Sequence, residues 1–293
     1  MSLLCKTYSM EEPRLQYYQL GDDVTAFSST RFGGYSKGQY GEFNINRYCG
    51  DSEDAIRQNR QALCRLLSVA DNRLLMPHQV HLAEIAVVDE HLLKLSAEDC
   101  RQRLEGIDAL MTDVPDVCIG VSTADCIPVL LYDKTNHAAC AIHAGWRGTV
   151  QRIVEKSVKK MAAVYGTRAQ DLTAQIGPGI HLESFEVGNE VYDAFHHEGF
   201  PMEKISKMMG EKWHIDLPEC NRLQLLSTGV PATHITVSQV CTFQQSDTFF
   251  SARRLGIDSG RIFTGILLRD QTSSPNSVAL VEPVILTLTN SPM

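Results

Sequence analysis

Three short segments of the chain carry side chains that could bind a metal ion. "PHQVH" contains His78 and His81, "TADC" ends in Cys126, and "AIHAGWRG" contains His143. Imidazole nitrogens and a thiolate favour zinc among the abundant metals, with copper as a competitor. Structural zinc sites usually close with four ligands in short paired spacings, whereas three protein ligands and an open position are typical of catalytic sites. The residues indicate a catalytic metal centre; the alternative is that they are unrelated core side chains.

The segment after His143 also offers groups that bind an anion. Two glycines in "HAGWRG" permit close backbone approach, and a helix that begins near Thr149 would present free N–H groups. Arg147 adds a planar guanidinium group that suits phosphate or carboxylate. The alternative is that Trp146 fills the core and that Arg147 is simply solvated.

A second candidate for anion binding lies at residues 28–51. This polar stretch holds five glycines and follows an expected strand, with Arg31 near its start, so we expect a loop that covers a ligand. It is not a P-loop, because Gly-x4-Gly-Lys-Ser/Thr is absent. Arg31 and Arg147 are our candidates for holding phosphate, with Asn44 as a hydrogen-bonding partner. The alternative for the loop is a glycine-rich hairpin without a ligand.

Strands and helices mix along the chain without a regular alternation. Short apolar or β-branched runs predict strands at residues 24–30, 117–121, 127–133, 137–144, 235–242 and 261–268. The turn between the third and fourth of these predicts an antiparallel hairpin. Apolar residues at helical spacing predict helices at residues 53–68, 150–165, 187–197 and 218–228. We expect Thr149 to cap the second helix and Gly166 to follow its end, and mixed sheets covered by helices as the fold.

The composition is that of an acidic globular protein. The 293 residues carry a net charge of −8, which predicts no partnership with nucleic acid or an anionic membrane. Nine cysteines, with no export signal and no apolar run of about 20 residues, predict a cytoplasmic protein without disulfides. Residues 269–293 open with a linker-like Ser/Pro/Asn composition, and "VILTLT" within them could form an edge strand or hang loose.

Taken together, the motifs resemble one family, the YfiH-like laccase-domain family, also described as multicopper polyphenol oxidase and as purine nucleoside phosphorylase. The matching strings run in order as "STRFGG", "FNI…CGD", "QVH", "GIDALMT", "TADCIPVLL", "HAGWRGT", "IGPGI…FEVG" and "FFSARR…GR". They cover about residues 24–268, so the resemblance implies one domain over 1–268 and leaves the tail, 269–293, outside it. Leu82 replaces the glycine that usually follows "QVH", and Ala252 replaces the usual tyrosine of "FFSYRR".

The resemblance carries the family's metal ligands onto His81, Cys126 and His143, which makes His78 a neighbour. It implies an α/β (α+β) fold of mixed β-sheets with outer helices, a layered sandwich similar to the catalytic domain of cytotoxic necrotizing factor toxins. It also implies phosphorolysis of adenosine, inosine, guanosine and methylthioadenosine, and deamination of adenosine. The expected partners are therefore nucleoside and phosphate, and we expect a monomer or a homodimer.

A zinc ion with three protein ligands and a water would lower the pKa of that water to about 7, which suits attack on C6 of adenine. Asp125, beside Cys126, is our candidate for moving the protons, although strand alternation could point it away. Cys126 and His143 are therefore catalytic candidates as well as ligands. Phosphorolysis instead requires cationic groups that hold phosphate below C1′ of the ribose.

Three alternatives stay open at this point. The first is a copper-dependent polyphenol oxidase, which the older family name suggests, although a multicopper site needs many histidines, typically in His-x-His pairs, and the chain has ten histidines and no such pair. The second is a Cys126–His143 hydrolase or amidase, in which the thiolate is the nucleophile; the family has a reported link with peptidoglycan-precursor editing. The third is a binding partner or scaffold without catalytic activity.

Overall fold

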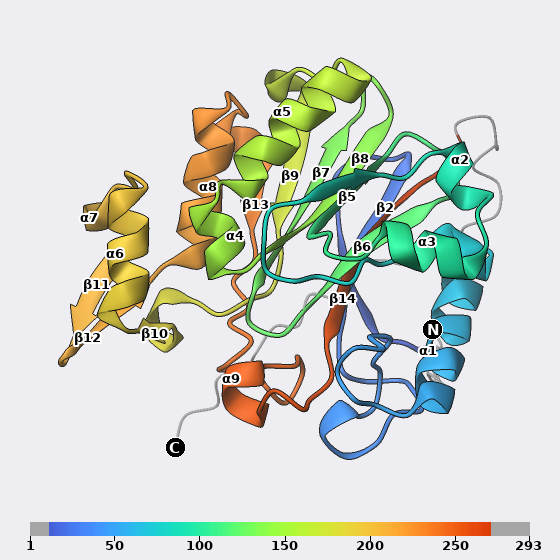
Figure 1. The fold of residues 1–293 in the computed structure, drawn as a ribbon, viewed down its shortest axis with the longest axis horizontal. Coiled ribbons are helices and arrows are strands. Elements are labelled where there is room, and N and C mark those ends of the chain that lie inside the picture. Colours follow the sequence, from blue (N-terminus) through green and yellow to red (C-terminus); the bar gives the residue numbers. More distant parts are fainter. Residues whose placement is uncertain (1–11, 271–293) are drawn as a thin grey trace, which may run out of the picture.

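The computed structural model describes residues 12–270, and its strands form two large sheets with helices on their outer sides (Figure 1). In order, the six-stranded sheet contains β13 (Ile235–Val237), β9 (Leu172–Ile176), β7 (Ile127–Asp133), β8 (Ala138–Ala144), β5 (Ala109–Thr112) and β4 (Ile85–Val87). The five-stranded sheet contains β1 (Leu15–Tyr18), β2 (Val24–Ser29), β14 (Ile262–Leu268), β6 (Cys118–Thr123) and β3 (Leu74–Leu75). Both sheets mix parallel and antiparallel pairs.

The helices lie mainly over the outer faces and at the edges of these sheets (Figure 1). Their bounds are α1 (Glu53–Leu67), α2 (Glu90–Leu93), α3 (Ala97–Arg103), α4 (Trp146–Val150), α5 (Ile153–Tyr165), α6 (Asn189–His197), α7 (Met202–Ile205), α8 (Leu217–Ser227) and α9 (Ala252–Leu255). A small sheet of β10 (Glu186–Val187), β12 (Lys212–Ile215) and β11 (Ser206–Met209) lies beside α6 and α7, at the left of Figure 1.

Strand β7 shows how the layers are built. Its Val129 and Leu131 side chains pack into the core beneath α5, while the alternate residues Leu130 and Tyr132 pack into the core shared with the five-stranded sheet. Side chains alternate between the two faces of a strand, and both faces of β7 are covered, so apolar residues fill most of the strand before it ends at Asp133. A third core lies between the five-stranded sheet and α1. The expected mixed sheets with outer helices, arranged as a layered sandwich, are confirmed.

The predicted helices at 53–68, 187–197 and 218–228 are confirmed within two residues at each end. The prediction that Thr149 caps a helix over 150–165 is wrong. A short helix, α4, already begins at Trp146 after Gly145, and α5 begins at Ile153. Arg152 separates the two helices in the left-handed conformation, with φ of 63°. Gly166 ends α5 in the left-handed conformation, as predicted.

The predicted strand at 235–242 is shorter than expected. Strand β13 pairs in parallel with β9, and the pairing ends at Val237 opposite Ile176. The chain of β9 then turns through Gly-Pro-Gly at 177–179, which interrupts the ladder, and an isolated parallel bridge between Gly179 and Cys241 follows. The interpretation of "VILTLT" falls in residues 271–293, outside the described residues. Within residues 12–270 no disulfide is formed, and no helix is long and apolar enough to cross a membrane.

Candidate metal centre

The candidate ligands meet at one edge of the six-stranded sheet because of the way its strands are paired. β7 and β8 form the predicted antiparallel hairpin, in which Pro128 lies opposite His143. Cys126 immediately precedes β7 and His143 lies near the end of β8, so the hairpin brings both to the same edge. β5 runs antiparallel to β8, and β4 runs parallel to β5. The chain before β4, which contains His81, therefore enters at this edge as well.

His81, Cys126 and His143 form a compact group of candidate ligands. One ligand atom from each lies within 4.8 Å of the others. The two imidazole rings meet edge to face, with centroids 4.8 Å apart and planes at 77°. His143 is only 2% exposed, Cys126 is half-buried, and His81 is exposed. The group is therefore anchored in the core on one side and open to solvent on the other.

Gly145 lets the chain pass close to this group. A Cβ atom at this position would lie 2.9 Å from Sγ of Cys126 and 3.1 Å from Cδ2 of His81. Contacts this short require the neighbouring atoms to move. The glycine after "HA" in "HAGWRG" is thus explained by the space that the two ligands occupy, rather than by an unusual backbone angle.

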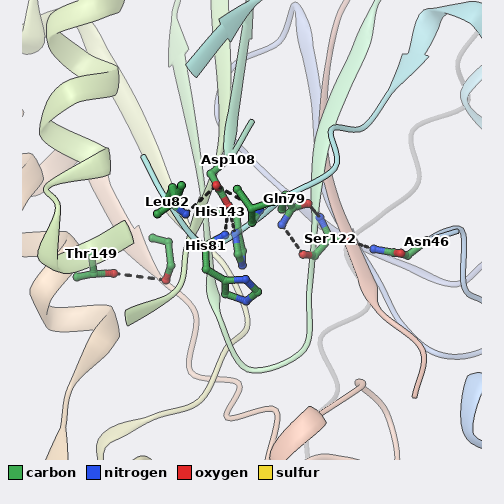
Figure 2. Close-up of polar contacts among 10 residues, drawn as sticks. Asn46, Gln79, His81, Leu82, Asp108, Ser122, His143 and Thr149 are labelled. Carbon is green, nitrogen blue, oxygen red and sulfur yellow. Dashed lines mark hydrogen bonds and ion pairs between the residues drawn. The ribbon is translucent and has the colours of Figure 1, made fainter. Parts of the chain in front are cut away.

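Asp108, which immediately precedes β5, forms hydrogen bonds with two of the three ligands (Figure 2). Its Oδ1 accepts a hydrogen bond from Nδ1 of His143 at 2.8 Å and from the backbone N–H of His81 at 3.0 Å. Its Oδ2 accepts from the backbone N–H of Leu82 at 2.8 Å and of Val80 at 3.4 Å. Because Nδ1 of His143 is engaged with Asp108, the other ring nitrogen, Nε2, is left to face Cys126.

The turn that carries His81 is held from a second side by Gln79. Its side-chain amide donates to the backbone carbonyl of Ser122 at 2.8 Å and accepts from the Ser122 N–H at 2.7 Å. The Ser122 hydroxyl accepts from Asn46, which extends the network into the glycine-rich segment (Figure 2). This double anchor matters because His81 has φ of 62°, a left-handed conformation that non-glycine residues adopt only when their surroundings hold them there.

Cys126, His143 and Asp108 shift one another's pKa values in the direction that favours the charged forms. Burial disfavours the ionised sulfur, but the charge and hydrogen bond of His143, with a smaller contribution from His81, lower the pKa of Cys126 to about 6. Burial opposes protonation of His143, yet Cys126 and Asp108 raise its pKa to about 9. Burial alone would raise the pKa of Asp108, but the hydrogen bond and charge of His143 and the backbone donors lower it. In the protein without a metal, these contacts favour the thiolate form of Cys126 and the protonated form of His143.

The donor set fits a divalent transition metal. A thiolate and two imidazoles are the ligands that zinc prefers, and the thiolate form is the one that coordinates. Asp108 supplies the hydrogen bond to the second nitrogen of a ligating histidine that such sites usually contain. Among residues 12–270, this is the one group of three or more His, Cys, Asp or Glu side chains close enough to share an ion.

The predicted anion-binding residues lie in different surroundings. Arg147 is exposed in α4, with its guanidinium carbon 4.3 Å from the ring centroid of Trp146, which is half-buried. Arg31 donates from Nε to the carbonyl of Gly41 at 3.0 Å and from Nη1 to that of Ser246 at 2.7 Å, so it ties two loops together. Of these two arginines, Arg147 has the guanidinium group that is more open to a ligand.

Asn44 is fully buried. Its Nδ2 donates to a carboxylate oxygen of Asp51 at 2.9 Å, and its Oδ1 accepts from the backbone of Arg261 at 3.2 Å. These bonds connect the glycine-rich segment 28–51 to the start of β14. They give Asn44 a structural task, and its predicted contact with phosphate stays a prediction.

Asp125 adjoins Cys126 but its carboxylate faces the segment 241–255. Oδ1 accepts from the hydroxyl of Thr242 at 2.8 Å, and Oδ2 accepts from the backbone N–H of Arg253 at 2.7 Å. The residue has φ of 88°, so the backbone turns sharply just before the ligand. Its predicted part in proton transfer stays a prediction.

His78 lies outside the three-residue group of candidate ligands. Its Nδ1 lies 2.6 Å from a carboxylate oxygen of Glu105, and its ring stacks on Tyr48 with centroids 3.8 Å apart.

Sequence reasoning missed the tasks of Asp108 and Gln79. "GIDALMT" placed a carboxylate before an apolar strand, but its contact with His143 spans 35 residues along the chain. Only the strand order of the sheet reveals it.

The fold and the site define an α/β protein with a candidate three-ligand metal centre at a sheet edge. The chain belongs to the family described as multi-copper polyphenol oxidoreductase laccase, whose model matches residues 25–269. It is 45% identical over 248 residues to a protein named purine nucleoside phosphorylase from Bacteroides thetaiotaomicron, covering 84% of this chain and 92% of that one. It is 40% identical over 259 residues to adenosine deaminase RL5 from an unknown prokaryotic organism, covering 88% and 98%.

The fold is shared with a solved structure of the same family. The crystal structure of Bacillus licheniformis hypothetical protein YfiH superposes with a TM-score of 0.83 at 28% identity, covering 90% of this chain and all of that one. The expected membership of the YfiH-like laccase-domain family is therefore confirmed.

Proposed function

We propose that this chain is a zinc-dependent purine nucleoside phosphorylase that also deaminates adenosine. Its substrates would be adenosine, inosine, guanosine and methylthioadenosine, which phosphate splits into the free base and the sugar 1-phosphate. The observation that carries the proposal is the group of His81, Cys126 and His143, with its ligand atoms within 4.8 Å of one another. It occurs in a chain similar to proteins named for both activities.

His81, Cys126 and His143 would hold the zinc ion. When bound, zinc supplies a Lewis acid that lowers the pKa of a coordinated water to about 7. The protein fixes the donors: Cys126 is already a thiolate near neutral pH, and the buried His143 is oriented by Asp108. Substrate would approach from the side of His81, which is the exposed member of the group.

The side chains on either side of His81 give the purine an apolar contact surface. Val80 is 38% exposed and Leu82 is 45% exposed, although both are large apolar residues. Apolar side chains that remain exposed next to a polar site are typical of ligand-binding surfaces. The replacement of the family's usual glycine by Leu82 would therefore enlarge the apolar surface offered to the base.

Arg147 would hold the phosphate in phosphorolysis. Arg147 lies two residues after Gly145, where an added Cβ would crowd two of the ligands, and its guanidinium carbon lies 4.3 Å from the ring centroid of Trp146. Among the described residues it forms no ion pair with an acidic side chain. A fixed cation of this kind places phosphate near the ribose and stabilises the charge that develops as the base leaves.

The test is to incubate the purified protein with adenosine, with and without phosphate, and to separate adenine from inosine. Adenine that forms only with phosphate shows phosphorolysis, and inosine without phosphate, or inosine and hypoxanthine with it, shows deamination. Cys126→Ala is the control for a contaminating enzyme. Protein that is loaded with zinc and produces neither product contradicts the proposal.

A second candidate function is a cysteine hydrolase or amidase, including one that acts in peptidoglycan-precursor editing. Asp108, His143 and Cys126 form a chain of contacts that resembles a carboxylate–imidazole–thiol triad. Alkylation separates the two functions. A nucleophilic Cys126 would react with iodoacetamide in the active, metal-containing protein, whereas a coordinated sulfur would be protected.

The description of the family favours a third candidate, a copper-dependent polyphenol oxidase. The group His81–Cys126–His143 could also take copper, since the donors suit both metals. Metal analysis of protein produced without added copper distinguishes these candidates. Oxidation of a phenol by copper-loaded protein, with no nucleoside turnover by zinc-loaded protein, would favour the oxidase.

A further inference from the structure

We propose that Asp108 is the positioning residue of this metal centre, and that its single carboxylate sets both the tautomer of His143 and the turn that presents His81. The inference rests on the proposed metal binding. It concerns a residue that contacts two ligands and would not itself contact the metal.

The first task concerns His143. An ionised carboxylate accepts hydrogen bonds and donates none, so the 2.8 Å contact to Oδ1 of Asp108 places the hydrogen of the imidazole on Nδ1. Nε2, on the side of Cys126, is then the nitrogen that gives up its hydrogen when a metal binds. Asp108 and His143 are 0% and 2% exposed, so bulk water has no access with which to replace this bond.

The second task concerns His81. Three consecutive backbone N–H groups, from Val80 to Leu82, point at the two oxygens of Asp108. His81 lies in the middle of this turn with φ of 62°. The converging N–H groups would be unsatisfied without an acceptor, and the left-handed conformation needs an external constraint. The carboxylate supplies both.

The position of Asp108 is itself fixed by the sheet. Its backbone N–H donates to the carbonyl of Glu84 at 2.9 Å, and its carbonyl accepts from the N–H of His143 at 2.8 Å. The backbone and the side chain of Asp108 therefore both contact His143. These bonds hold the backbone of Asp108 at the start of β5, within reach of both ligands.

Replacement by asparagine tests this arrangement because an amide cannot perform both tasks. If its NH2 group takes the place of Oδ1, it faces the His81 N–H and donates to Nδ1 of His143, which moves the imidazole hydrogen to Nε2. If it takes the place of Oδ2, it faces the N–H groups of Val80 and Leu82 and releases the turn. Either orientation disturbs at least one ligand.

Asp133 provides the matched control. It is a fully buried carboxylate at the far end of β7, and its Oδ1 accepts from the backbone N–H groups of Thr135 at 2.9 Å and Asn136 at 3.1 Å. Asp133→Asn removes an equivalent buried acceptor without touching the metal centre. It should lower the melting temperature while leaving metal binding unchanged.

The experiment measures zinc affinity by competition with a chromophoric chelator, and the absorption spectrum of the cobalt(II)-substituted protein. We expect Asp108→Asn to weaken zinc binding about 10- to 100-fold, as replacing a partner of a metal-bound histidine typically does, and to change the cobalt spectrum. Asp133→Asn should stay within about threefold of wild type. If both variants bind zinc as wild type does, or both weaken it equally, the inference is overturned.

A second measurement needs no variant and covers the case in which Asp108→Asn fails to fold. Nitrogen-15 NMR of the zinc-loaded wild-type protein reports which nitrogen of His143 carries hydrogen. We expect a protonated Nδ1 and a metal-shifted Nε2, and the reverse assignment overturns the inference. Wild-type protein that binds no zinc overturns the proposed function as well, whereas normal nucleoside turnover and zinc affinity in Asp108→Asn overturn only this inference.

Discussion

Cys126 and His143 lie side by side because β7 and β8 pair as an antiparallel hairpin. Cys126 immediately precedes β7, and His143 lies near the end of β8. The hairpin buries seven consecutive residues in each strand, so the relative position of the two side chains is fixed by the most buried part of the fold. The sulfur and the imidazole can therefore act as a preformed pair. His81 is the member of the group that depends on a loop.

Cys126→Ala should remove bound zinc and every activity together. The sulfur is one of three protein ligands, and two imidazoles alone leave too few donors to retain the ion. Metal analysis after dialysis should fall from about one zinc per chain to almost none. Cys140→Ala is the control, because Cys140 is a buried thiol of β8 that packs into the core away from the site. Retained zinc in Cys126→Ala would remove the sulfur from the ligand set.

His81→Ala and His78→Ala should behave differently. His81 belongs to the group of ligand atoms, whereas His78 is held by Glu105 and Tyr48. We expect the first substitution to weaken zinc binding by at least about 100-fold and the second to change it by less than about threefold. Isothermal titration with zinc measures both. Equal effects would show that the "PHQVH" histidines share the task.

Arg147→Ala should harm phosphorolysis more than deamination. A hydrogen bond to a charged group contributes roughly 1.5–3 kcal/mol, so kcat/KM for phosphate should fall about 10- to 100-fold while deamination stays close to wild type. Arg57→Ala, which removes an exposed arginine of α1 that pairs with Asp54, is the control for lost surface charge. An unchanged dependence on phosphate would show that another group binds it.

The alkylation rate of Cys126 in metal-free protein should depend on pH in a predictable direction. Because the pKa of Cys126 is lowered from 9.0 to about 6, the reactive thiolate persists as the pH falls and is lost only near pH 6. The rate with iodoacetamide should therefore be half-maximal near pH 6, with Cys126→Ala giving the background from the other thiols. Zinc should suppress the reaction. A midpoint near pH 9 would contradict the close contact with His143.

The parts of the fold that could be predicted are those set by local sequence. The hairpin of residues 127–144 follows from two apolar runs around a polar turn, and α1 follows from its periodic leucines. The start of α4 at Trp146 could not be predicted, because Thr149 is the better capping residue and Gly145, which precedes the helix, has no side chain with which to cap it.

The candidate site divides in the same way. The types of His81, Cys126 and His143 indicated metal chemistry, and the family resemblance chose His81 over His78. The left-handed turn at His81 could not be predicted, because histidine adopts that conformation at only a small fraction of positions. The turn depends on the hydrogen bond from His81 to Asp108, which lies 27 positions further along the chain. It also depends on the hydrogen bond between Gln79 and Ser122, which are 43 positions apart.

X-ray absorption at the zinc edge of the purified wild-type protein tests the central claim most directly, because it reports the atoms bound to the metal. The account predicts one sulfur at about 2.3 Å, two imidazole nitrogens at about 2.0–2.1 Å and one further light atom. A shell without sulfur, or one made only of oxygen atoms, would contradict the convergence of His81, Cys126 and His143 on a single ion.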